Sequence, residues 1–162
     1  AVPTQAREIH EDFICFCGGP IFDLELEYDF GTDSDFSGGT DTWDLFTGEL
    51  YLYPELVNIT VNSLVAGEYI DSIEVMWTDF CGVGCTEFEI FGANGSVSVS
   101  NSTVSMLETV TLTRDDLGED IQSFSLSSFE GRIEEFRVTI LPTPAPVVSL
   151  GLMGLLAIRR RR

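Results

Sequence analysis

The chain has 162 residues, with 27 acidic and 8 basic side chains and a formal net charge of −19. This length fits one domain with a single core, and so acidic a surface repels phosphate backbones and anionic lipids, which argues against nucleic acid as a partner and leaves divalent cations as candidates. With a single histidine and no lysine, the chain lacks the residues for Ser-His-Asp, Cys-His or lysine-based catalysis, so we expect no enzymatic activity.

Residues 1–20 are predicted to form an N-terminal arm. The first part of this segment is polar and mixed and contains His10, which we expect at the surface. The sequence Gly18-Gly19-Pro20 then breaks any regular structure.

Alternation of apolar and polar residues dominates the rest of the body. In residues 21–30 apolar side chains alternate with carboxylates, so one face of the segment is core and the other is acidic. The same pattern predicts strands over residues 45–53, 56–64, 69–77, 86–91, 96–105, 107–113, 121–129 and 133–140. No segment has a convincing helical period. Short antiparallel strands with one apolar face each require two packed sheets, so we predict an all-β fold, an antiparallel β-sandwich of jelly-roll type, over residues 21–141.

The four cysteines form two close pairs, Cys15 with Cys17 and Cys81 with Cys85. An even number of cysteines in an exported chain favours structural disulfides. If Cys15 and Cys17 lie in an extended segment, both could reach the second pair and staple the arm to the sheet. Alternatively, Gly82 and Gly84 would let Cys81 and Cys85 close on each other. A tetrathiolate zinc site and redox chemistry are further alternatives, although zinc ligands usually have a tighter and more regular spacing.

The segment from Asp33 to Asp44 has the spacing of a calcium-binding loop. Its oxygen-bearing residues fall where an EF-hand loop places its ligands, with a glycine at the sharp turn; these residues are Asp33, Asp35, Ser37, Asp41 and Asp44. Asp44 stands where an EF-hand has a bidentate Glu, and strands rather than helices flank the loop. Calcium binding and a solvated acidic loop are therefore the two interpretations.

Tyr51 and Tyr53 lie on the same face of a predicted strand. Tyrosines on an exposed face can stack against sugar rings, whereas aromatic residues in strands more often belong to a core. These two residues are therefore candidate sugar-stacking positions, with a core role as the alternative.

Residues 142–162 have three parts. A proline-spaced start, with Pro142, Pro144 and Pro146, leads into the uncharged and mostly apolar residues 147–158, and the chain ends on Arg159, Arg160, Arg161 and Arg162. A helix of this apolar length rises about 18 Å, less than the roughly 30 Å hydrocarbon core of a bilayer. The arginines would stay on the cytoplasmic side. We expect a short hydrophobic helix that contacts the inner membrane transiently and serves as a sorting signal.

This three-part tail resembles that of the PEP-CTERM family of exosortase-processed bacterial proteins, although the centre of the motif reads Pro144-Ala145-Pro146 without the usual glutamate. The resemblance implies that an exosortase-type membrane transpeptidase cuts near the prolines. The domain upstream would then be released or attached at the cell surface.

Residues 127–140, SSFEGRIEEFRVTI, resemble the final strand of the galactose-binding-like sandwiches often found in carbohydrate-binding modules. We therefore expect an exported, non-catalytic protein of the cell surface or extracellular matrix, with a structural or adhesive role and with extracellular polysaccharide or other copies of itself as partners. A calcium-dependent carbohydrate-binding module is the first alternative. An unrecognised hydrolase that uses a pair of carboxylates is the second.

Overall fold

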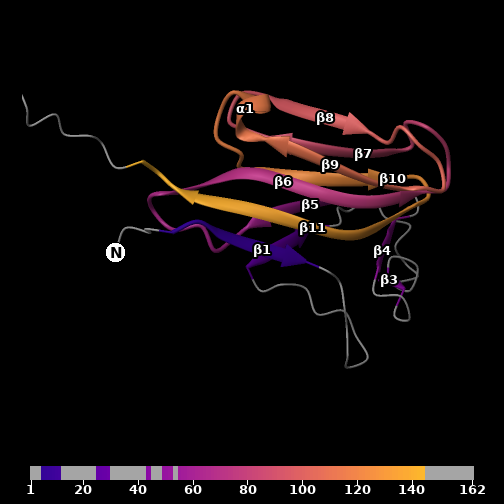
Figure 1. The fold of residues 1–162 in the computed structure, drawn as a ribbon, viewed down its shortest axis with the longest axis horizontal. Helices are drawn as coiled ribbons and strands as arrows, with labels where there is room; N and C mark the ends of the chain where they lie inside the picture. The colour runs from indigo at the N-terminus through magenta and orange to yellow at the C-terminus, as the bar shows by residue number, and fades with distance from the viewer. Residues whose placement is uncertain (1–4, 12–24, 30–42, 45–48, 53–54, 145–162) are drawn as a thin grey trace, which may run out of the picture.

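The computed structural model describes residues 5–11, 25–29, 43–44, 49–52 and 55–144. Within these residues two antiparallel sheets pack face to face (Figure 1). The predicted β-sandwich is thereby confirmed, whereas the predicted C-terminal hydrophobic helix lies outside the described residues.

Sheet A is centred on two long strands, β6 (Glu68–Asp79) and β11 (Gly131–Pro142). They pair from Gly131 opposite Asp79 to Pro142 opposite Glu68. The strand order is β3-β4-β11-β6-β9, and β1 pairs with the later part of β11. The other strands of this sheet are β1 (Arg7–Glu11), β3 (Trp43–Asp44), β4 (Glu49–Leu52) and β9 (Leu107–Thr113).

Sheet B has the strand order β2-β5-β10-β7-β8. Its strands are β2 (Leu26–Asp29), β5 (Glu55–Val61), β7 (Thr86–Phe91), β8 (Ser96–Ser100) and β10 (Ser123–Ser128). From β5 to β11 the chain changes sheet at each connection between strands except that from β7 to β8. This repeated crossing wraps the two sheets around one core, as in a jelly roll.

The core lies between the sheets and follows directly from the alternation in the sequence. Trp77, Phe88, Phe124 and Phe136 are fully buried. The rings of Phe124 in sheet B and Phe136 in sheet A meet edge to face with centroids 5.3 Å apart. This aromatic contact packs the two sheets against each other. Burial of each such side chain contributes about 1.5–3 kcal/mol to the free energy of unfolding.

Three elements differ from the sequence-based expectation, and the shortest of them is β3, which occupies the end of the predicted Asp33–Asp44 loop. Residues assigned to the N-terminal arm form β1, in which Ile9 is buried and Glu11 accepts a hydrogen bond from the Tyr28 hydroxyl at 2.9 Å. A short helix, α1 (Arg114–Leu117), follows β9. A capping box formed by Thr113 and Asp116 starts α1, and Gly118 ends it with a φ of 78°. The four-residue helix is too short for the apolar periodicity by which longer helices are predicted.

The two ends of the sandwich carry different parts of the chain. The connections β6–β7, β8–β9 and β10–β11 meet at one end, on the right in Figure 1, which we call the loop pole. At the other end, the terminal pole, Arg7 pairs with Ile140, and the Thr143 N–H donates to the Gly67 carbonyl at 2.7 Å. The first described residues and the end of β11 therefore lie at the same pole, about 40 Å along β11 from the loop pole. Among the described helices none is long and apolar enough to cross a membrane.

Candidate functional site

Exposed apolar side chains gather at the loop pole. Of the large hydrophobic residues exposed in the described part of the chain, most lie there; we call them the apolar crown, and they are Phe80, Val83, Val104, Met106, Leu107 and Phe129. Val83 is 70% exposed and Phe129 53% exposed. Exposed apolar side chains grouped in this way make the loop pole a candidate contact surface.

The three loops that carry the crown are bonded to one another. The Phe80 N–H donates to the Glu130 carbonyl at 2.9 Å, and the Ser105 N–H donates to the Asp79 carbonyl at 2.6 Å. Cys85 accepts a longer hydrogen bond, 3.3 Å, from the Phe129 N–H. The crown is therefore one surface contributed by both sheets.

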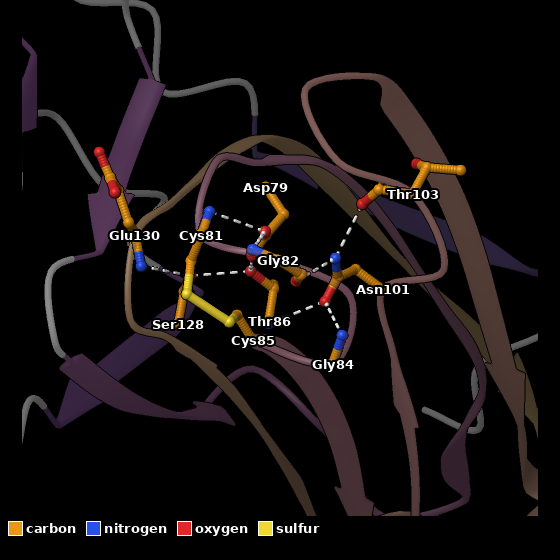
Figure 2. The surroundings of a disulfide bond; sticks show 10 residues. All are labelled: Asp79, Cys81, Gly82, Gly84, Cys85, Thr86, Asn101, Thr103, Ser128 and Glu130. Carbon is orange, nitrogen blue, oxygen red and sulfur yellow. Dashed lines mark hydrogen bonds between the residues drawn. A yellow bond between two sulfur atoms is a disulfide. The ribbon is translucent and has the colours of Figure 1, made fainter.

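A disulfide between Cys81 and Cys85 closes the β6–β7 loop, with the two Cα atoms 6.0 Å apart (Figure 2). Inside it the Cys85 N–H donates to the Gly82 carbonyl at 3.1 Å, and Gly84 has a φ of 84°, which a residue with a side chain rarely adopts. The glycines thus permit the tight turn that the disulfide then fixes.

Asp79 supports this loop from the end of β6. Its carboxylate is 1% exposed, and Oδ1 accepts hydrogen bonds from the amides of Cys81 at 3.0 Å and Gly82 at 2.9 Å. Oδ2 accepts from the Thr86 hydroxyl, which lies 2.7 Å from the Ser128 hydroxyl (Figure 2). These donors offset the cost of burying the carboxylate.

Asn101 supports the loop from the end of β8. It is 2% exposed, and its Oδ1 accepts from the amides of Gly84 at 2.9 Å and Thr86 at 3.0 Å. Its Nδ2 donates to the carbonyls of Gly82 at 2.9 Å and Thr103 at 2.8 Å (Figure 2). Every donor and acceptor of this amide has a partner, so the β8–β9 loop is held against the β6–β7 loop.

Two charged groups lie beside the crown. The Arg132 guanidinium lies over the Phe80 ring, 5.2 Å from its centroid, in a cation–π contact. Glu108 accepts hydrogen bonds from the Ser102 amide at 3.0 Å and the Trp77 indole N–H at 3.3 Å. The Ser102 hydroxyl bond is the largest influence holding the pKa of Glu108 below its ordinary value, and partial burial opposes it. The carboxylate is therefore ionised at neutral pH.

The structure pairs Cys81 with Cys85, one of the arrangements that the sequence left open. It contradicts the alternative in which the first cysteine pair bridges to this loop, because each sulfur forms a single disulfide. Cys15 and Cys17 themselves lie outside the described residues.

The predicted calcium loop lies largely outside the described residues, since only Asp44, at the end of β3, falls within them. Among the residues that the structure describes, no three His, Cys, Asp or Glu side chains are grouped as a metal site. Calcium binding stays a prediction.

The remaining predicted residues are separated in the fold. Tyr51 lies in β4 opposite Arg132, close to the loop pole, and Tyr53 lies outside the described part. Pro142 ends β11 at the terminal pole and Pro144 is exposed, whereas Pro146 and the four terminal arginines are outside it. His10 is exposed, as predicted, with its Nε2 3.1 Å from a Glu135 oxygen.

Sequence reasoning did not identify the crown. Its residues lie in or beside turn segments, where an apolar side chain does not belong to a strand that faces the core. Apolar residues in predicted turns were therefore the sequence feature that could have indicated an exposed apolar surface. The convergence of three loops depends on strand pairing between distant parts of the chain, which local patterns do not report.

No protein-family model and no curated protein matches this chain. Solved structures that resemble it include carbohydrate-binding modules. One is a family 29 carbohydrate-binding module, with 12% identity, coverage of 86% of this chain and 93% of that one, and a TM-score of 0.47. Another is the family 32 carbohydrate-binding module of C. perfringens NanJ in complex with galactose, with 11% identity, coverage of 82% and 99%, and a TM-score of 0.42.

A third is a family two carbohydrate esterase from Cellvibrio japonicus, with 10% identity and a TM-score of 0.38. The match covers 87% of this chain and 36% of the esterase. At such identities and TM-scores these similarities carry no argument about function, which has to come from the chain's own surfaces.

Proposed function

We propose that this chain is a non-catalytic carbohydrate-binding domain with an adhesive role outside the cell, and that the apolar crown is its contact surface. The observation that carries the proposal is the gathering of exposed Phe80, Phe129 and aliphatic side chains on loops held by a disulfide and two buried, fully bonded side chains. Sugar rings present C–H faces that pack on aromatic and aliphatic groups. Loops that are already ordered lose little entropy on binding.

Charge narrows the class of glycan. The chain carries a formal charge of −19, so uronic or sulfated polymers would meet repulsion, whereas neutral and cationic glycans would not. Arg132, which lies over the Phe80 ring, places a positive charge at the edge of the crown.

The position of the histidine supports a non-catalytic role. His10 is the only histidine of the chain. It pairs with Glu135 on the outer face of sheet A, where β1 lies beside β11, and it is not part of the crown. Both cysteines of the crown loop are held in a disulfide. A Ser-His or Cys-His nucleophile therefore has no place at the crown.

Export through the tail is part of the same proposal. The Cys81–Cys85 disulfide is typical of an oxidising, extracytoplasmic compartment. The three-part tail that resembles the PEP-CTERM family implies processing by an exosortase-type transpeptidase after transient contact with the inner membrane. Intact mass of the protein from its native cell fraction tests this: loss of the residues after the Pro motif supports processing, and a full-length mass in the membrane fraction contradicts it.

Binding to a panel of neutral and charged polysaccharides tests the crown. We expect Phe129→Ala to weaken retention by about tenfold, roughly the contribution of one stacked ring. Val65→Ala is the matched control, because Val65 is also 53% exposed but lies in the β5–β6 connection at the terminal pole. Equal retention of both variants and the parent chain would show that the crown is not the contact surface, and no retention on any glycan would contradict carbohydrate binding there.

A further inference from the structure

The outer face of sheet B carries mostly polar side chains, with one large apolar side chain toward each end. Each outward position of β8 and β10 is a serine: Ser96, Ser98 and Ser100 on one strand, Ser123, Ser125 and Ser127 on the other. Between these strands β7 presents Glu87, Glu89 and the half-buried Phe91, and beyond β10 β5 presents Asn58, Thr60 and Leu56, which is 48% exposed. We call this surface the serine face.

Strand register aligns these residues across the sheet. In the central row, Asn58 of β5 lies opposite Ser125 of β10, which lies opposite Glu89 of β7, which lies opposite Ser98 of β8. Neighbouring strands are about 4.8 Å apart, and outward residues repeat about every 6.6 Å along a strand. The result is a regular array of hydroxyl, amide and carboxylate groups.

These side chains form no hydrogen bond or ion pair with one another or with any other part of the described chain. The outer face of sheet A is different, since Arg137 there bonds Glu135 at 2.8 Å and approaches Glu74 at 3.7 Å. The hydrogen-bonding groups of sheet A are thus partly satisfied internally. Those of the serine face are available to an external partner.

Ser125, at the centre of the serine face, is the most informative residue. It is 4% exposed, and within the described residues its hydroxyl has no hydrogen-bond partner. Its strand neighbours Phe124 and Leu126 are buried in the core, so the Ser125 side chain points to the outer face. A buried hydroxyl without a partner is costly and rare, and its neighbours across the sheet, Asn58 and Glu89, belong to the same face.

We propose that the serine face binds an extended, uncharged polysaccharide lying flat on sheet B. Serine hydroxyls and the Asn58 amide both donate and accept hydrogen bonds, and the carboxylates of Glu87 and Glu89 accept from sugar hydroxyls. The two carboxylates and the absence of a cation among these residues disfavour an anionic polymer. The central row has no apolar side chain, and Phe91 and Leu56 lie in the rows on opposite sides of it, so the face lacks the apolar core of a protein interface.

This inference extends the proposed carbohydrate-binding function to a second surface. The serine face and the crown share no residue, so either can fail while the other stands. A domain with both surfaces would hold a polymer along the sheet and contact a further ring or chain at the loop pole.

Affinity electrophoresis in gels containing a neutral soluble glucan, galactan or mannan tests the proposal with the full chain. Ser98→Arg adds a bulky cation to the serine face on the edge strand β8, and Thr111→Arg makes the same change in charge on the outer face of the edge strand β9 of sheet A. We expect Ser98→Arg to reduce retardation at least threefold and Thr111→Arg to leave it unchanged.

Ser125→Ala is the second variant. It makes the side chain smaller, so it introduces no steric clash that could prevent folding. It should weaken retardation at least twofold while leaving the melting temperature of the free protein equal or higher, since it removes an unpaired buried hydroxyl. Phe129→Ala, in the crown, should leave this retardation in place. The proposal is overturned if no neutral glycan retards the parent chain, or if the Ser98 and Ser125 variants are retarded like the parent. Loss of retardation in Phe129→Ala alone would assign the glycan to the crown and overturn the serine face.

Discussion

Asp79 and Asn101 bind the two halves of a single loop: Asp79 accepts from the amides of Cys81 and Gly82, and Asn101 from those of Gly84 and Thr86. Asp79 ends β6 in sheet A, whereas Asn101 follows β8 in sheet B. The loop is therefore tied to both sheets, and its disulfide is one of three supports. Crown residues Phe80 and Val83 take their positions from these buried polar contacts.

Substitution of Asn101 should destabilise the protein strongly. Asn101→Ala removes four hydrogen bonds and leaves the buried Thr86 amide and the Thr103 carbonyl without the partner that the side chain supplies, so we expect the free energy of unfolding to fall by about 2–4 kcal/mol. Asn94→Ala is the control, because Asn94 is exposed and bonds Glu119 at the surface; it should cost less than about 1 kcal/mol. Urea unfolding of both variants measures this difference, and equal midpoints would refute the supporting role of Asn101.

Gly131 should not tolerate a side chain. A Cβ at this position would lie 2.5 Å from the Ser128 hydroxyl oxygen and 2.8 Å from that of Thr86, inside the network around Asp79. We expect Gly131→Ala to lower the free energy of unfolding by about 1–3 kcal/mol. Gly95→Ala is the matched control, since a Cβ there meets no atom within 4 Å. Thermal unfolding that ranks Gly95→Ala below Gly131→Ala would contradict this reading of the network.

Removal of the disulfide should have a modest effect on stability. Cys81 and Cys85 are separated by 4 positions, and closing so short a loop stabilises the folded state by about 2 kcal/mol through the unfolded chain. The double variant Cys81→Ser with Cys85→Ser should therefore fold, because Asp79 and Asn101 still hold the loop. A melting curve gives the stability, and far-ultraviolet circular dichroism gives the fold. Complete unfolding of the variant would mean that the polar contacts cannot hold the loop by themselves.

Acid should weaken the contacts that hold β1 at the terminal pole. Arg7 bonds Glu68 at 3.2 Å and also Glu25, while Ser63 donates to Glu25. The pKa of Glu68 is lowered chiefly by the Arg7 hydrogen bond, and that of Glu25 chiefly by the Ser63 hydroxyl and then by Arg7. Carboxyl groups whose pKa is lower in the folded state stabilise it above their unfolded value of about 4.3, and this contribution is lost as the pH falls through the folded pKa.

The variant that tests this prediction is Arg7→Gln. It should lower the free energy of unfolding at pH 7, and this free energy should then fall less steeply than that of the parent chain below about pH 5. Arg114→Gln removes the exposed pair with Asp120 and the contact over the Tyr69 ring, and it should leave the loss of stability below about pH 5 unchanged. Denaturant unfolding over a series of pH values compares the two. Parallel curves for Arg7→Gln and the parent chain would show that this cluster does not contribute to acid sensitivity.

Calcium binding by the Asp33–Asp44 segment predicts a response to the ion. Millimolar calcium should raise the melting temperature, because a ligand specific to the native state stabilises it, and Asp33→Asn combined with Asp35→Asn should abolish the rise. Magnesium at the same concentration controls for general screening of the acidic surface. An unchanged melting temperature in calcium would exclude a native-state site of useful affinity.

Local alternation predicted the sandwich and several of its strands. β7 and β9 have the predicted bounds, because Phe88, Ile90, Val110 and Leu112 alternate with polar residues and turn residues delimit each segment. β1 was missed because its one buried apolar residue, Ile9, stands among charged residues. Its place in the sheet comes from pairing with β11, more than a hundred residues away.

The candidate sites were harder to predict than the fold. The Cys81–Cys85 pairing was among the alternatives because Gly82 and Gly84 permit a tight loop, but the roles of Asp79 and Asn101 depend on contacts between different strands. The serines at 96, 98 and 100 are visible as an alternating run. Their alignment with Glu89 and Ser125 is set by strand register, which a local pattern does not report.

Both described chain ends lie at the terminal pole, and this arrangement determines how the domain can be presented on a support. A chain held by its tail would carry the crown at the pole opposite the end of β11, about 40 Å from Pro142. The serine face, which runs parallel to this axis, would stand upright and open to the side. Immobilising the protein on a sensor through a C-terminal tag should therefore leave both surfaces accessible, whereas attachment at the β6–β7 loop would turn the crown toward the support.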